Sequence, residues 1–196
     1  MSKPKVGFYW CASCGGCEEA IVDLAEVILD VVEMVDIVFW PCAMDFKRAD
    51  VEAMDDGEID ACFVNGAIRT SEQREMVGLL RRKAKLLVAF GSCSHMGGVP
   101  GLANLFTREG ILETVYGDWA FSTTNPTHIR PQASTEVHEG TLELPTFDAT
   151  VKTLDQVVET DYYLPGCSPP VSLIVDAVKA IVAGELPPRG SVLAPD

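Results

Sequence analysis

Seven cysteines are the residues of this 196-residue chain whose type and spacing could do chemistry. Cys14 and Cys17 form a C-x-x-C pair, whereas Cys93 and Cys167 stand alone much further along the chain. No apolar signal segment opens the sequence and no uncharged apolar run reaches transmembrane length, so we expect the chain in the reducing cytoplasm, with no direct membrane span. Clustered thiols in that compartment are more often metal ligands or redox groups than structural disulfides.

The elements that must position these cysteines can be predicted from hydrophobic periodicity. Short apolar runs predict five buried strands, at residues 6–10, 37–40, 61–64, 86–90 and 162–164. Apolar spacing and capping residues predict helices over 17–35, 46–55, 71–83 with Ser71 as the N-cap, a stretch after Pro100, and 171–183 with Gly184 as its stop. Strands that alternate with helices indicate an α/β fold, with a five-stranded parallel sheet covered on both faces.

The predicted domain occupies residues 1–184. Residues 117–153 break the alternation, are rich in Thr, Pro, Ser and Gly, and predict a long loop insertion before the last strand. The insertion contains His128 and His138, to which we assign no role. Residues 185–196 are predicted to leave the domain as a C-terminal linker or tail.

Six of the seven cysteines fall just after predicted strands. Cys11, Cys14 and Cys17 follow the first strand, Cys42 the second, Cys93 the fourth and Cys167 the fifth, whereas Cys62 lies inside the third, where a small core residue is expected. The carboxyl ends of parallel strands share one edge of the sheet, where ligands bind. Topology alone should therefore gather these thiols.

Spacing alone leaves three kinds of site open. Four thiolates from dispersed loops suit an iron–sulfur cluster, the single C-x-x-C before a helix suits a redox dithiol, and a thiolate set also suits zinc. Glycines at 15, 16, 91 and 166 beside the cysteines would let backbone N–H groups approach and donate hydrogen bonds to cluster sulfurs.

Three motifs in order carry a family resemblance: C-x-x-C at 14–17, G-x-C-x-x-x-G-G at 91–98, and P-G-C-x-P-P at 165–170. Together they resemble the small subunit of [NiFe] hydrogenases and, in the later two motifs, the related 20 kDa subunit of complex I. The resemblance spans about residues 6–184. It implies a flavodoxin-like three-layer fold and one proximal [4Fe-4S] cluster, bound by Cys14, Cys17, Cys93 and Cys167.

The resemblance also implies partners and a role. The separated first pair and the missing twin-arginine signal look like the cytoplasmic methyl-viologen-, F420- or NAD-reducing group. Electrons would pass between a Ni–Fe site in a large subunit and a further electron-transfer subunit using flavin, F420, NAD or a heterodisulfide reductase. The alternative is a relay subunit of a complex I-like or heterodisulfide reductase-linked assembly that does not use hydrogen. No cysteine follows Cys167, which implies a one-cluster form or a chain that stops where another segment begins.

Several residues depart from the family pattern or stay without a role. Ser168 adds a residue before the prolines of the last motif, and we expect a small loop shift there without loss of the ligand. Glu19 matches a carboxylate of the first motif and could serve the interface or proton handling, unless it is simply a helix N-terminal carboxylate. Cys11 and Cys42 could be alternative ligands or redox-sensitive neighbours, although core thiols are the simpler interpretation, and His95 could hydrogen-bond the cluster or a partner.

The charge balance excludes one large class of partners. Fifteen Lys and Arg residues against 29 Asp and Glu residues give a net charge of −14. Phosphate contacts need basic side chains, so we expect no nucleic-acid binding and no attraction to an anionic membrane surface.

Overall fold

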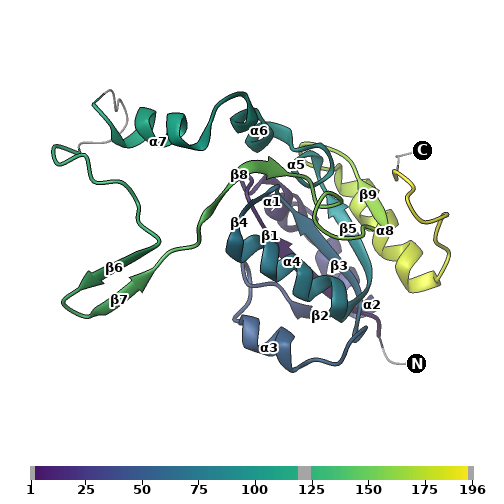
Figure 1. The fold of residues 1–196 in the computed structure, drawn as a ribbon. Helices are drawn as coiled ribbons and strands as arrows, with labels where there is room; N and C mark the ends of the chain where they lie inside the picture. Colours follow the sequence, from purple (N-terminus) through teal and green to yellow (C-terminus); the bar gives the residue numbers. More distant parts are fainter. Residues whose placement is uncertain (1–2, 119–124, 194–196) are drawn as a thin grey trace.

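A five-stranded, all-parallel sheet organises the computed structural model, which describes residues 3–118 and 125–193 (Figure 1). Its strands are β1 (Lys5–Trp10), β2 (Asp36–Phe39), β3 (Ile59–Asn65), β5 (Ala84–Phe90) and β9 (Tyr162–Leu164). The spatial order β2-β1-β3-β5-β9 is the flavodoxin-like order, so the predicted fold class is confirmed. The order reverses between β1 and β3, which is the position where open α/β sheets bind ligands.

Helices cover both faces of the sheet because each face buries alternate strand residues. On one face, Phe8, Phe63 and Phe90 pack under α1 (Gly16–Val22), α2 (Val27–Met34) and α8 (Val171–Ala183). On the other face, Cys62, Val64 and Leu87 pack under α3 (Arg48–Ala53) and α4 (Ser71–Lys83). Two separate cores result, one for each face.

Four of the five predicted helices need correction, and three of these precede β5. The helix predicted over 17–35 is broken between α1 and α2, where Ala25 adopts a left-handed φ of 48° and short i→i−3 bonds form a turn. The helix predicted over 46–55 is only α3. The N-cap of α4 is Thr70, whose hydroxyl accepts from the Gln73 amide, whereas the Ser71 hydroxyl accepts from Thr146 N. Gly184 ends α8 at a φ of 70°, as predicted.

The region after β5 is a series of short helices. They are α5 (Ser92–Met96), α6 (Gly98–Gly101), the 3-10 helix η1 (Leu102–Leu105) and α7 (Arg108–Tyr116), so the helix predicted after Pro100 is interrupted. The insertion then follows, and it contains strands that the loop prediction missed. β4 (Ile68–Thr70) pairs with β8 (Phe147–Lys152), and β6 (Ser134–Val137) forms a hairpin with β7 (Gly140–Glu143). Part of the predicted insertion, residues 119–124, lies outside the described residues.

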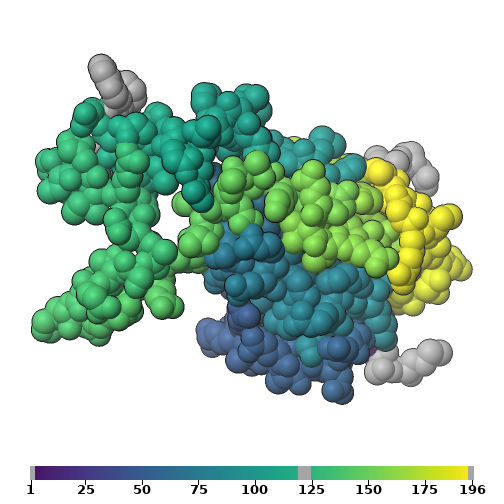
Figure 2. Space-filling view, viewed as in Figure 1, coloured from purple at the N-terminus to yellow at the C-terminus, as the bar shows by residue number. Residues whose placement is uncertain are grey.

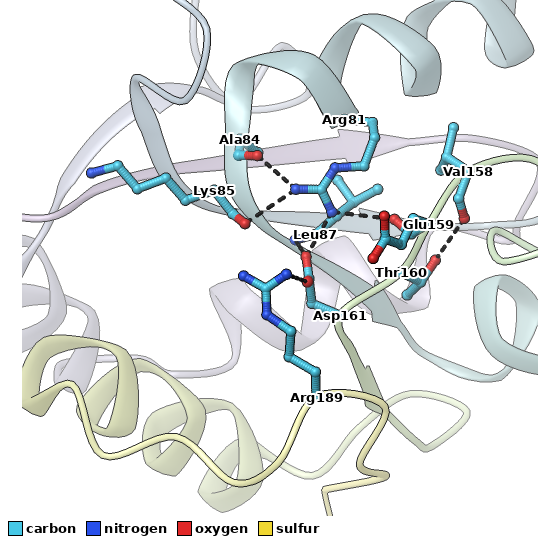
Figure 3. A network of polar contacts seen from close by, with 9 residues as sticks. All are labelled: Arg81, Ala84, Lys85, Leu87, Val158, Glu159, Thr160, Asp161 and Arg189. Atoms are coloured by element: carbon cyan, nitrogen blue, oxygen red, sulfur yellow. Dashed lines mark hydrogen bonds and ion pairs between the residues drawn. The ribbon is translucent and has the colours of Figure 1, made fainter.

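The C-terminal segment does not leave the domain over its described part. Arg189 forms an ion pair with Asp161 at 2.8 Å (Figure 3). Gly190 N also donates to Asp161 O. The same buried carboxylate accepts from Arg81 Nη1 at 2.6 Å and from Leu87 N at 2.8 Å. Asp161 thus ties the start of β9 to α4, to β5 and to the tail, because a buried carboxylate needs such partners. Residues 194–196 lie outside the described part.

Candidate functional site

The loop after β1, which carries the C-x-x-C pair, is anchored to the end of β3. Ala12 and Ala67 exchange backbone hydrogen bonds of 2.9 and 2.8 Å, and Cys11 N donates to Asn65 O. The fully buried Asn65 side chain accepts from Ser13 Oγ at 3.1 Å. The loop is thereby fixed before Cys14, and α1 begins at Gly16 with Cys17 in its first turn.

The loops that carry Cys93 and Cys167 are tied to each other. Gly91 N donates to Leu164 O, and Ser92 donates to Gly166 O through both its backbone amide, at 2.8 Å, and its hydroxyl, at 2.9 Å. Cys93 then lies in α5, directly after β5. Two cysteines that are 74 residues apart in sequence are therefore carried by loops that are hydrogen-bonded to each other at the carboxyl edge of the sheet.

The four predicted ligands are electrostatic neighbours. Burial, together with smaller contributions from negative charge on Cys93, Cys14 and Cys167, raises the pKa of the Cys17 thiol to about 12. Burial also raises the pKa of Cys93, again with contributions from Cys14 and Cys167. Cys17 and Cys93 are buried, whereas Cys14 and Cys167 are exposed. Four thiols that oppose one another's ionisation need a cationic centre to be held together as thiolates.

Glycines and backbone amides shape the space around the sulfurs. A Cβ on Gly91, where φ is 84°, would lie 2.4 Å from Cys17 Sγ and 3.5 Å from Gly166 O. A Cβ on Gly98, where φ is 49°, would lie 2.8 Å from Cys93 Sγ. Gly16 N donates to Cys14 Sγ at 3.5 Å, and the Val99 amide donates to Cys93. Two backbone amides thus donate to cysteine sulfurs, and bonds of this kind tune an iron–sulfur centre. Bonds from these loops to cluster sulfurs stay a prediction.

The donor set is compatible with a cluster. Within the described residues, no three Cys, His, Asp or Glu side chains are close enough to share a single metal ion, as zinc requires. A cubane binds each thiolate through a different iron, so its ligands stand further apart.

The three remaining cysteines lie in different surroundings. Cys62 is fully buried in the core, as predicted, and Cys11 is buried beside it, so that the two thiols interact with each other. Cys42 is exposed in the turn after β2, and the core interpretation is wrong for it. Burial and, to a smaller extent, the negative charge of Glu18 raise the pKa of the Cys42 thiol.

The carboxylate built into this edge is Glu18, whereas the sequence motif pointed to Glu19. Glu19 is exposed, but Glu18 is 5% exposed and accepts hydrogen bonds from Trp40 Nε1 and Asn65 Nδ2. Burial raises the pKa of Glu18, and these two donors oppose that effect. The available signal was Asn65, a polar residue at the end of a predicted buried strand.

Of the three histidines, His95 lies two residues after Cys93, and the other two belong to the insertion. The His95 ring lies 4.7 Å from that of Tyr163, and its buried Nδ1 has no hydrogen-bond partner among the described residues. His128 and His138 are exposed on the insertion, near Asp118 and Glu139 respectively. No helix in the described part of the chain is long and apolar enough to cross a bilayer.

Known proteins resemble this chain over most of its length. Residues 14–181 match the family described as NADH ubiquinone oxidoreductase, 20 Kd subunit. An F420-non-reducing hydrogenase iron-sulfur subunit of Archaeoglobus profundus is 41% identical, over 95% of this chain and 58% of that one. The NAD-reducing hydrogenase HoxS subunit delta of Cupriavidus necator is 27% identical, over 93% and 80%. The chain thus spans little more than half the length of the F420-non-reducing hydrogenase relatives it matches.

The fold has solved counterparts. A crystal structure of NAD+-reducing [NiFe]-hydrogenase in the H2-reduced state contains a chain that matches with a TM-score of 0.79 and 28% identity, over 94% of both chains. The resemblance to hydrogenase small subunits and to the 20 kDa subunit, predicted from the three cysteine motifs, is confirmed. The chain belongs to the NADH ubiquinone oxidoreductase 20 Kd subunit family.

Proposed function

We propose that this chain is the electron-transfer small subunit of a cytoplasmic [NiFe] hydrogenase and holds one proximal [4Fe-4S] cluster. The observation that carries the proposal is the convergence of Cys14, Cys17, Cys93 and Cys167 at the carboxyl edge of the sheet. Relatives named as hydrogenase subunits support the reaction class. In this proposal the chain is an oxidoreductase component, and the catalytic Ni–Fe site lies on a partner.

Each part of the site has a physical task. When bound, the cluster takes up and releases one electron at a time. The four cysteines hold it, and the Gly16 and Val99 amides donate to ligand sulfurs, which stabilises negative charge there. Gly91 keeps a side chain away from Cys17 Sγ. In this proposal, no residue of this chain takes part in the cleavage of H2.

The surface around the site is suited to a covering partner. Exposed apolar side chains follow Cys93 along the chain, at Met96, Val99, Leu102, Leu105 and Phe106. Large apolar side chains exposed in one short stretch are typical of a protein interface. A large subunit seated there would exclude water from Cys14 and Cys167 and bring its Ni–Fe site near the cluster, and a further subunit would carry the electrons onward.

Metal analysis of variants tests the ligand set. The full chain, purified anaerobically with its partners, should contain iron and acid-labile sulfide at four each and give an EPR signal on reduction. Cys93→Ser and Cys167→Ser should each lose iron. Cys42→Ser is the matched control, because Cys42 is also exposed at this edge but lies outside the set, and it should keep iron. A folded chain that holds zinc and no iron would refute the proposal.

A second candidate follows from the description of the family itself. A complex I-like or heterodisulfide reductase-linked relay would use the same cluster without hydrogen. The complex I relatives carry adjacent cysteines in the first motif, whereas Cys14 and Cys17 are separated, which favours the hydrogenase. The partner decides between the two: a large subunit with two C-x-x-C motifs and bound nickel supports the hydrogenase, and a nickel-free partner supports the second candidate.

A further inference from the structure

The β6–β7 hairpin has two chemically different faces. Thr135 pairs with Leu142 and Val137 with Gly140, so these residues share one face, which Leu144 continues. The other face carries the pairs Ser134–Glu143 and Glu136–Thr141, and Thr141 Oγ1 donates to Glu136 Oε1 at 2.8 Å. The hairpin is therefore apolar on one side and acidic on the other.

The apolar face has no cover within the described chain. Leu142 is 56% exposed and Leu144 52%, and together with Tyr116 and Ile129 they line an open hollow. Figures 1 and 2 show the hairpin standing clear of the sheet and its helices. An isolated two-stranded hairpin is at best marginally stable in water, so an ordered, amphipathic one calls for a surface to pack against.

The hairpin is linked to the surface beside the cysteines through α7. The exposed apolar stretch from Met96 to Phe106 begins three residues after Cys93 and leads into α7. Tyr116, at the end of α7, lines the same hollow as Leu142 and Leu144. A partner that covers the cysteine edge is therefore the partner within reach of the apolar hairpin face.

Charge identifies the kind of partner. The hairpin, residues 134–143, contains three glutamates and no lysine or arginine, in a chain of net charge −14. A second copy of this chain would bring like charges together, which disfavours association. A surface with an apolar centre and a rim of lysine or arginine would match both faces.

We propose that the β6–β7 hairpin is a clasp that holds the subunit carrying the Ni–Fe site, against an apolar surface with a basic rim. This inference rests on the proposed function for the identity of the partner. The clasp adds a contact remote from the cluster, so its loss weakens assembly without removing iron.

Matched variants on opposite faces test the clasp. Leu142→Asn places an amide on the apolar face, and Thr141→Asn makes the same change on the acidic face of the neighbouring position. Because burial of a leucine is lost, Leu142→Asn should weaken the Kd for the purified large subunit by about tenfold or more, whereas Thr141→Asn should stay within about twofold. Iron content and circular dichroism of both full-length variants should match the wild-type chain, since the hairpin lies outside both cores.

The possible failures are distinguishable. Equal binding by wild type, Leu142→Asn and Thr141→Asn would overturn the clasp and leave the proposed function standing. A wild-type chain that dimerises in sedimentation, with Leu142→Asn monomeric, would overturn the choice of partner. Wild-type chain that binds no nickel subunit refutes the proposed function, and the clasp with it.

Discussion

Replacement of Gly91 by alanine probes the contact between the β5 loop and Cys17. The new Cβ would lie 2.4 Å from Cys17 Sγ, and ordinary contact begins at 3.4 Å, so the sulfur and the loop must separate by 1.0 Å (3.4 − 2.4). Ligand distances in metal sites hold to about 0.2 Å. A displacement of this size therefore removes Cys17 from any geometry it shares with the other thiols.

The substitution has a second effect, which a control can isolate. At a φ of 84° and a ψ of 165°, Gly91 lies in a region almost restricted to glycine, so alanine is strained there by roughly 1–3 kcal/mol, equivalent to roughly 2–12 °C in Tm for a chain of this size. Gly184→Ala carries a smaller, left-handed strain at a φ of 70° and a ψ of 16°, and its Cβ meets nothing within 4 Å. Both variants should lose Tm, and only Gly91→Ala should lose iron.

Iron and sulfide per chain, measured beside the thermal unfolding curve, are the assay. Full iron retention by Gly91→Ala would refute the reasoning, whatever its fall in Tm. Such a result would mean that Cys17 Sγ does not need the position it occupies against Gly91.

Three further predictions concern stability. Thr70→Ala should lower the free energy of unfolding by about 1 kcal/mol in denaturant titrations, because it removes the N-cap of α4. Ser71→Ala should change it by under about 0.5 kcal/mol, and equal losses for the two variants would argue against the cap. Asp161→Asn should lower the free energy of unfolding by about 3 kcal/mol, because it leaves Arg81 without its buried partner. Arg189→Gln, at an exposed side chain, should lower it by about 1 kcal/mol or less. A smaller loss for Asp161→Asn than for Arg189→Gln would contradict this reasoning. Burial raises the pKa of Asp60, but hydrogen bonds from Lys85 and from Lys5 N outweigh burial and hold this pKa below 3.8. The stability that this carboxylate contributes is therefore present above pH 3.8 and is lost as the pH falls through the folded-state pKa. Asp60→Asn should be less stable than wild type at pH 7, with the gap closing below pH 3.8, and a gap independent of pH would exclude this cause.

The sheet and the gathering of thiols could be predicted because both follow from local pattern and from general topology. Five apolar runs gave the five parallel strands, and their carboxyl ends located Cys14, Cys17, Cys93 and Cys167 at one edge. The break at Ala25 could not be predicted, because no glycine or proline marks it and tertiary packing sets the left-handed residue.

Other features escaped prediction because they depend on distant partners. Glu18 differs from Glu19 only in facing Trp40 and Asn65, which come from other strands' ends. The tail had the composition of a linker, yet Arg189 finds Asp161. β6 and β7 have the alternating polarity of strands, but the surrounding stretch is rich in Thr, Pro, Ser and Gly, and this composition favoured the prediction of a loop.

The returning tail has a consequence for the rim of the sheet. β9 would be an exposed edge with unpaired N–H and C=O groups, a template for strands of other molecules. Tyr163 N donates to Ser191 O and Leu193 N donates to Tyr163 O, so the chain covers that template with its own backbone. The opposite edge, β2, is only four residues long. Both edges of the sheet are thus poor sites for the addition of a strand from another molecule, because the chain pairs with β9 at one edge and β2 is short at the other.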